Sequence, residues 1–125
     1  MTLKESGENY LETILILKER LGVVRAIDIA NELEFSKPSV SRAIGILKEN
    51  GLVRVEDGGH IILTKEGLAA ASAVYDRHVV IAEFLTSIGV DKKTATEDAC
   101  RIEHILSEKS FEKMKERLAL NEHAE

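Results

Sequence analysis

The segment EDACRIEH, residues 97–104, brings together three residue types that bind first-row transition metals. On a helix, Cys100 precedes Glu103 by three residues and His104 by four, so a thiol, a carboxylate and an imidazole lie on one side. Sulfur, oxygen and nitrogen donors of these kinds are ligands for divalent metals. The spacing therefore predicts a metal site. The competing interpretation is an apolar, buried cysteine beside a solvent-facing Glu-His pair.

Two further polar residues fall on or beside apolar stripes. His78 is in helical register with Val74, Ile81 and Leu85, and a buried neutral imidazole needs partners for both ring nitrogens. A metal ion satisfies that need, and so does a neighbouring backbone carbonyl. Glu12 stands next to the core-facing residues of the first predicted helix. Each residue alone is more often structural than ligating, so the metal hypothesis depends on their convergence in space.

Long helices must position these residues, because one proline and eight glycines interrupt only 125 residues. Apolar spacing predicts helices over residues 6–21, 28–33, 65–88 and 92–106, with Thr64 and Asp91 as caps of the last two. A final helix is expected to open at Ser110, bury Phe111, Met114 and Leu118, and fray over residues 121–125. The strings LVRVE and HIILT, around Asp57-Gly58-Gly59, predict a β-hairpin.

The segment between Ser36 and Gly51 predicts a helix with two contrasting faces. Ser36 is the expected N-cap, Pro38 fits the first turn and Gly51 closes the far end. The core-facing residues are Val40, Ala43, Ile44 and Leu47. The opposite face is small, polar and cationic, with Lys37, Ser39, Ser41, Arg42, Gly45 and Lys48.

Three short helices followed by a hairpin are the order of a winged helix-turn-helix, whose second paired helix enters the DNA major groove. Arg42 suits a guanine edge, while Lys37 and Lys48 suit phosphates. The predicted DNA-contacting set is Lys37, Pro38, Ser39, Ser41, Arg42, Lys48 and the wing residue Arg54. The alternative is a solvated helix face used for protein contacts.

The amino-acid composition excludes several functional classes for this chain. The net charge of −5 argues against a polycationic nucleic-acid binder, and 44% apolar residues indicate a folded chain. The sequence has neither an apolar run of membrane-spanning length nor the apolar core of a signal peptide. The single cysteine fits a reducing cytoplasm, where we expect the protein to act.

Residues 6–118 resemble the diphtheria-toxin-repressor family of iron- and manganese-dependent transcriptional regulators. The length is closest to the small manganese-transport-regulator branch, which lacks a C-terminal SH3-like domain. The motifs that carry the resemblance are SGENYLETI, FSKPSVSRAIGIL, ILT-x-x-G, YDRH and ACRIEH. The resemblance implies a mainly α fold with a β-hairpin wing. A winged helix-turn-helix DNA-binding domain would span residues 1–64, and a helical metal-binding and dimerisation domain residues 65–125.

The resemblance also implies a homodimer on a double-stranded DNA operator, with divalent metal held between the later helices and the first helix. Glu12, His78, Glu103 and His104 match the family's ligands. Cys100 stands where manganese-type members have a glutamate and iron-type members a cysteine, and Asn9 where they have aspartate or methionine. An ancillary site of iron-type members is not expected, because Ala82 and Thr96 replace its glutamate and histidine.

The expected function is that of a Fe²⁺- or Mn²⁺-dependent regulator, a repressor of metal-uptake genes, and not of an enzyme. A thiol in place of a carboxylate favours Fe²⁺ over Mn²⁺, with Zn²⁺, Co²⁺ or Ni²⁺ able to substitute. One alternative is a metal-independent winged-helix regulator in which His78 and Cys100 belong to the core. A metallohydrolase is the other, although the sequence has no H-E-x-x-H motif or phosphate-binding glycine loop.

Overall fold

The computed structural model describes residues 5–123 as helices joined by one β-hairpin. The elements, in chain order, are α1 (Glu5–Leu21), α2 (Ala26–Leu33), α3 (Lys37–Glu49), β1 (Val53–Glu56), β2 (His60–Leu63), α4 (Lys65–Ser87), α5 (Lys92–Ile102) and α6 (Glu108–His123). The predicted fold class is thereby confirmed. No helix within this described part is long and apolar enough to cross a membrane. The chain divides into two compact units, residues 1–72 and 73–125.

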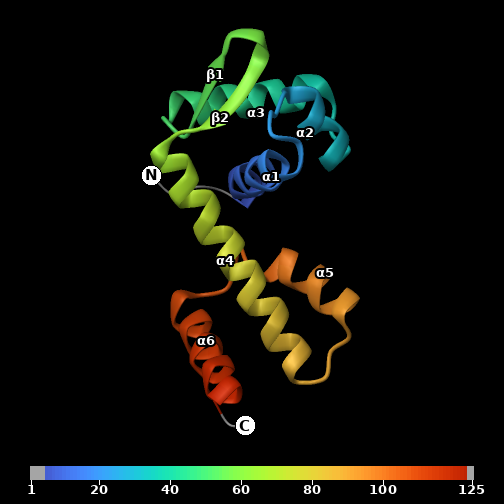
Figure 1. Cartoon of the computed structure of the whole chain (residues 1–125), viewed down its shortest axis with the longest axis vertical. Coiled ribbons are helices and arrows are strands. Elements are labelled where there is room, and N and C mark those ends of the chain that lie inside the picture. The colour runs from blue at the N-terminus through green and yellow to red at the C-terminus, as the bar shows by residue number, and fades with distance from the viewer. Residues whose placement is uncertain (1–4, 124–125) are drawn as a thin grey trace. The chain divides into compact units, whose positions relative to one another are not determined.

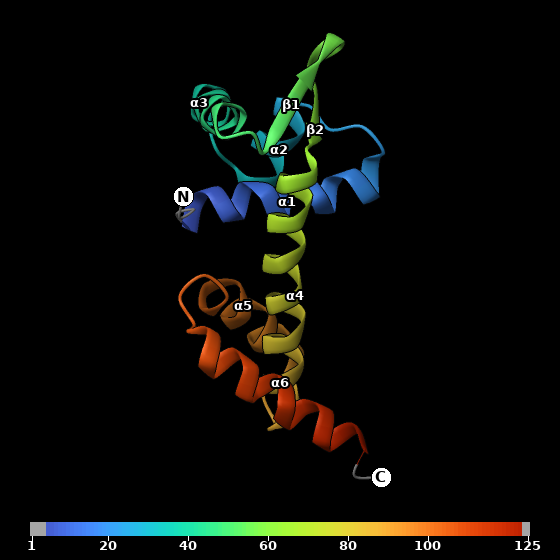
Figure 2. The ribbon, with the colours of Figure 1, turned by 90° about the vertical axis from the view of Figure 1, so that its left-hand side faces the viewer.

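The first unit is built on α1. Both views show α2, α3 and the hairpin on the same side of α1 (Figures 1 and 2). Its core is a single apolar cluster to which every element contributes, including Leu11, Ile14, Ile29, Val40, Leu47, Val53 and Ile61. The apolar spacing of the first helix predicts an inward stripe of Tyr10, Leu11, Ile14, Leu15, Leu17 and Leu21. The structure buries this stripe wholly or partly except at its end, where Leu21 is 50% exposed because the chain leaves the helix there.

Local signals explain the ends of the short elements. Ser36 caps α3 as predicted, its Oγ accepting from the Ser39 backbone N–H at 3.3 Å. Helix α2 begins two residues before the predicted position, because the Asp28 carboxylate accepts a hydrogen bond from the Arg25 backbone N–H at 2.9 Å. The predicted hairpin is confirmed. Its strands pair antiparallel, and Gly58 and Gly59 turn the chain with φ of 83° and 78°.

The second unit joins the later part of α4 to α5 and α6 through a small apolar core. Val80, Ile81, Ala99 and Phe111 form its centre, and Met114 and Leu118 pack against it as predicted. Three expected boundaries were wrong. Helix α5 ends at Ile102 and not near residue 106. Helix α6 begins at Glu108, because the Ser107 Oγ accepts from the Ser110 backbone N–H at 3.1 Å. It continues to His123, and residues 124–125 of the expected frayed tail lie outside the described residues.

Gly67, in the first turn of α4, lies against the backbone of the connection between α3 and β1. A Cβ at this position would lie 1.8 Å from the backbone oxygen of Leu52. Thr64 ties the same region together, because its hydroxyl donates to the Gly51 carbonyl at 2.6 Å and accepts from the Gly67 N–H at 3.0 Å. Only glycine allows this packing.

Replacing Gly67 by alanine is expected to lower the free energy of unfolding by about 3 kcal/mol or more, because backbone must move to admit the methyl group. The matched control is Gly45→Ala on α3, whose Cβ meets nothing within 4 Å. That control should stabilise the protein by about 0.5–1 kcal/mol. Chemical denaturation of both variants measures the difference, and equal stabilities would contradict the packing.

Candidate metal site and nucleic-acid interface

Three predicted ligands of the second unit converge on one point. Glu103 Oε2 lies 3.1 Å from His78 Nδ1, and Cys100 Sγ lies 3.8 Å from the same nitrogen. One donor atom from each of the three residues falls within 4.8 Å of the others. Donors that share one divalent ion at about 2.0–2.3 Å stand about 3–4 Å apart, and both distances to His78 Nδ1 lie in this range.

The burial of Glu103 supports this interpretation on physical grounds. The residue is 3% exposed, and no hydrogen bond within the described residues reaches its Oε2. A buried carboxylate oxygen without a hydrogen bond is costly unless a cation compensates it. The carboxylate, imidazole and thiol beside it form a donor set suited to Fe²⁺, Zn²⁺ or Co²⁺. The residues present therefore fit a divalent transition metal.

The three ligand side chains differ in how far they are exposed to solvent. His78 comes from the middle of α4, where its side chain is partly buried beside the stripe predicted for it. Cys100 lies in the last turn of α5 and is exposed. The hypothesis that Cys100 is a core residue is therefore wrong. An exposed thiol beside an imidazole and a buried carboxylate is placed for coordination and not for packing.

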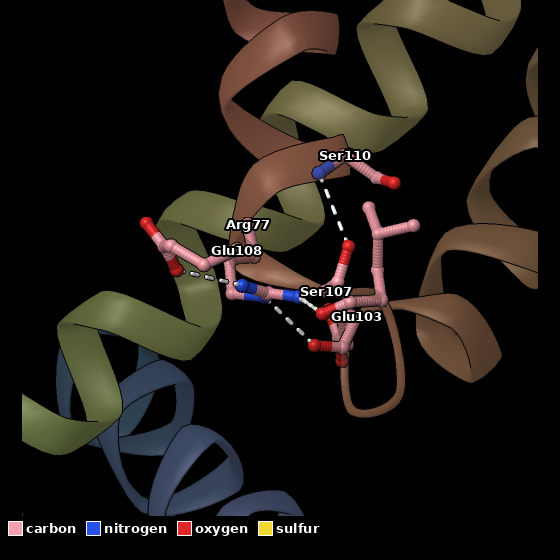
Figure 3. A network of polar contacts seen from close by, with 6 residues as sticks. Arg77, Glu103, Ser107, Glu108 and Ser110 are labelled. Atoms are coloured by element: carbon pink, nitrogen blue, oxygen red, sulfur yellow. Dashed lines mark hydrogen bonds and ion pairs between the residues drawn. The ribbon is translucent and has the colours of Figure 1, made fainter.

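His104 lies near the other oxygen of the Glu103 carboxylate. Its Nε2 is 3.4 Å from Glu103 Oε1, and its side chain is 3% exposed. Because α5 ends at Ile102, both residues belong to the connection between α5 and α6, which Figure 3 shows around Glu103 and Ser107. The two oxygens of Glu103 thus face two different imidazoles.

The two predicted ligands of α1 lie in the first unit. Glu12 is buried, with 7% of its surface exposed, and Asn9 is half-buried. Burial of a glutamate in a helix whose buried residues are mostly apolar is unusual and agrees with a special role. Their part in metal binding stays a prediction.

The region of the ancillary site holds few donors. Ala82, Glu83 and Thr96 line one hollow between α4 and α5, together with Lys92. The Thr96 hydroxyl donates to the Lys92 carbonyl at 2.9 Å. Among the residues that the structure describes, the group of His78, Cys100 and Glu103 is the one with three metal-ligating side chains in reach of one another.

The predicted DNA-contacting face of α3 is exposed along its whole length. Val40, Ile44 and Leu47 are buried on the opposite side, as predicted. The exposed residues are Lys37, Pro38, Ser39, Ser41, Arg42, Gly45 and Lys48. One of them is engaged locally, because the Ser39 hydroxyl lies 2.9 Å from the hydroxyl of Ser36. The helix thus presents two lysines, an arginine and small hydroxyl residues to solvent.

An arginine that sequence reasoning missed holds the wing. Arg25 donates from Nε to the Gly58 carbonyl at 3.1 Å, and its terminal nitrogen lies 2.9 Å from His60 Nε2. The available signal was Asp28, which caps α2 through the Arg25 backbone and so places this side chain beside the hairpin. The predicted wing residue Arg54 is exposed and forms an ion pair with Glu56 at 3.3 Å. Exposed pairs of this kind are weak and release the arginine easily.

Two family profiles match the chain. Residues 2–61 match the profile described as "Iron dependent repressor, N-terminal DNA binding domain". Residues 64–124 match the one described as "Iron dependent repressor, metal binding and dimerisation domain".

The chain is also similar to individual proteins of this kind. The uncharacterized HTH-type transcriptional regulator MJ0568 of Methanocaldococcus jannaschii is 35% identical over 90% of this chain and 92% of its own length. The diphtheria toxin repressor of Corynebacterium efficiens is 37% identical over 85% of this chain and 46% of its own length. The structure of the manganese regulator SloR aligns with a TM-score of 0.79 at 30% identity, covering 95% of this chain and 55% of that one. The chain therefore spans about half the length of the last two.

Asp91 holds the start of α5, the helix that ends in the metal-ligand cluster. Its carboxylate accepts from the Thr94 backbone N–H at 2.9 Å, and the hydrogen bonds with Thr94 lower the pKa of Asp91 from its usual 3.8. A carboxyl group whose pKa is lower in the folded state stabilises the fold above its unfolded pKa. That stabilisation is lost as the pH falls through the lower folded pKa.

Asp91→Ala is therefore expected to lower the melting temperature at neutral pH, and the deficit should shrink as the pH falls below 3.8. Asp91→Asn is the matched control, because its amide oxygen caps the helix without titrating. Thermal unfolding across a pH series measures both variants. A deficit for Asp91→Ala that grows towards low pH would contradict the assignment.

Proposed function

The chain belongs to the iron-dependent repressor family, and from that premise we propose that it is a homodimeric transcriptional repressor whose DNA binding depends on Fe²⁺ or Mn²⁺. The proposed DNA-binding domain is residues 1–64, and the proposed metal-binding and dimerisation domain is residues 65–125. Its proposed partners are a double-stranded DNA operator and a second copy of the chain. The genes that it regulates are those of metal uptake, and the protein acts in the cytoplasm.

The observation that carries the proposal is the buried carboxylate of Glu103 between two imidazoles, with an exposed thiol beside one of them. In our proposal His78, Cys100 and Glu103 hold the metal, and His104, Glu12 and Asn9 are further ligands. Family members named for iron and for manganese both match the chain. The soft thiol of Cys100 favours Fe²⁺ over Mn²⁺, with Zn²⁺, Co²⁺ or Ni²⁺ able to substitute.

Metal acts on DNA binding by thermodynamic linkage in this proposal. A bound divalent ion would supply two positive charges to a chain of net charge −5 and join α4 to the end of α5. A dimer must present its two α3 helices about 34 Å apart to meet successive major grooves. Metal therefore raises DNA affinity only to the extent that the ligands hold it more tightly in that arrangement than in others.

On the DNA side, the exposed face of α3 enters the major groove in our proposal. Arg42 reads a base edge, Lys37 and Lys48 contact phosphates, and Pro38, Ser39 and Ser41 permit close approach. Arg54 reaches the backbone from the wing once it leaves Glu56. The backbone N–H groups at the start of α3 favour a phosphate.

The metal-independent alternative predicts a core role for His78 and Cys100, and the exposure of Cys100 opposes it. The metallohydrolase alternative receives no support from the matched profiles, which describe DNA-binding, metal-binding and dimerisation domains. Neither is retained.

Cys100→Ser is expected to lower the affinity for Co²⁺ or Fe²⁺ by about tenfold or more, because the thiolate ligand is lost. Thr96→Ala, one turn earlier on α5 and likewise exposed, is the control and should bind as the parent does. Anaerobic calorimetry measures the affinities. The thiolate charge-transfer absorption of the Co²⁺ form should vanish in Cys100→Ser alone. Equal binding by the two variants would remove Cys100 from the ligand set.

Adding Fe²⁺ or Mn²⁺ is expected to raise the affinity for an operator selected from genomic fragments by about 5- to 150-fold, the usual range of coupling between two sites. Arg42→Ala should then cost about 1–3 kcal/mol on that operator while leaving the fold intact. Arg20→Ala is the control, since this exposed cation pairs with Glu32 away from α3. An affinity unchanged by a chelator would refute the regulatory proposal, and an unaffected Arg42→Ala would refute the recognition face alone.

A further inference from the structure

Arg77 precedes His78 on α4 and is not a predicted ligand. Its side chain contacts several groups of the second unit. Its Nε donates to the Glu103 carbonyl at 2.9 Å, and a terminal nitrogen donates to the Leu106 carbonyl. The other terminal nitrogen forms an ion pair with Glu108 at 3.4 Å. Figure 3 shows the guanidinium reaching from α4 to the connection between α5 and α6.

These contacts enclose the stretch of chain that carries two of the proposed ligands. Glu103 caps the C-terminal end of α5, where its backbone N–H donates to the Ala99 carbonyl at 2.9 Å, and His104 follows it in the connection to α6. Arg77 binds the carbonyl of Glu103 itself and that of Leu106, three residues later, and so fixes the turn at both ends. The fork of the guanidinium suits two separate carbonyls, which a lysine ammonium on a flexible stem does not.

Arg77 is also held in place from the side of α6. Its guanidinium carbon lies 4.9 Å from the centre of the Phe111 ring, and only 17% of its side chain is exposed. A cation stacked on a buried ring and shielded from water has little freedom to move. The Glu103 backbone is therefore anchored to a side chain that is itself held rigidly, and this side chain belongs to the same helix as His78.

We propose that Arg77 is a positioning residue for metal binding, which presets the Glu103 carboxylate against His78 before an ion arrives. This inference rests on the proposed metal site. Neighbouring residues on a helix point about 100° apart, so one turn of α4 supplies both a ligand and the group that orients a second ligand. Partners that orient metal ligands in this way alter metal affinity by about 10- to 100-fold when they are removed.

Electrostatics alone predicts that removing Arg77 changes the metal affinity in the opposite direction, which makes the proposal testable. Arg77 is a cation close to a site for cations, so loss of its charge alone should strengthen metal binding. The positioning role predicts weaker binding, and it predicts this even for Arg77→Lys, where the charge remains. The sign of the effect therefore separates orientation from charge.

The experiment compares Co²⁺ binding by the full chain with that of Arg77→Lys and Arg77→Met, at a temperature where thermal unfolding shows each apo-protein fully folded. Two controls remove nearby charge or contact without touching the turn. Arg101→Met neutralises an exposed cation next to Cys100, and Glu108→Gln removes only the ion pair of Arg77. Should Arg77→Met fail to fold, Arg77→Lys alone decides the outcome.

Both Arg77 variants are expected to bind Co²⁺ about 10- to 100-fold more weakly than the parent. Arg101→Met should bind equally or more tightly, and Glu108→Gln should stay within about fivefold. A role in stability alone would leave the affinity of a folded apo-protein unchanged, so parent-like affinity in Arg77→Lys overturns the inference. Tighter binding by both Arg77 variants overturns it as well. A parent chain that binds no Co²⁺ would instead refute the proposed metal site.

Discussion

The buried carboxylate of Glu103 is the constraint on which the second unit depends. A carboxylate removed from water must be compensated, and among the described residues the imidazoles of His78 and His104 face its two oxygens. Its backbone carbonyl, in contrast, is bound by Arg77. The side chain is thus left facing nitrogen and sulfur donors, which is the chemistry of a site for a soft or borderline cation.

The placement of that carboxylate depends on the C-terminal end of α5. Glu103 caps this helix with helical backbone angles, so spacing along one helix already puts Cys100 and Glu103 on one side. Packing against α4 brings both to His78, while His104, in the connection that follows, meets the other oxygen of Glu103. Asp91 holds one end of α5, and Arg77 holds the turn beyond the other end.

The two compact units divide the proposed work. The first carries an exposed, cationic helix face and a wing tied down by Arg25, features that favour phosphate and base contacts. The second carries the donor cluster. A net charge of −5 does not conflict with DNA binding, because the exposed face of α3 carries three cationic side chains, those of Lys37, Arg42 and Lys48. Regulation in such an arrangement is a matter of linkage between two equilibria, metal binding and DNA binding.

Local patterns in the sequence determined most of the fold. Ser36, Thr64, Asp91 and the glycines at 58 and 59 start or turn elements through hydrogen bonds and backbone preferences that depend on near neighbours only. The ligand types were readable for the same reason. The tertiary structure alone decided that Cys100 is exposed, that α5 ends at Ile102, and that Arg25 and Arg77 bind carbonyls 33 and 26 residues away. Contacts over such separations depend on how the helices pack, because spacing along one helix carries no information about its neighbours.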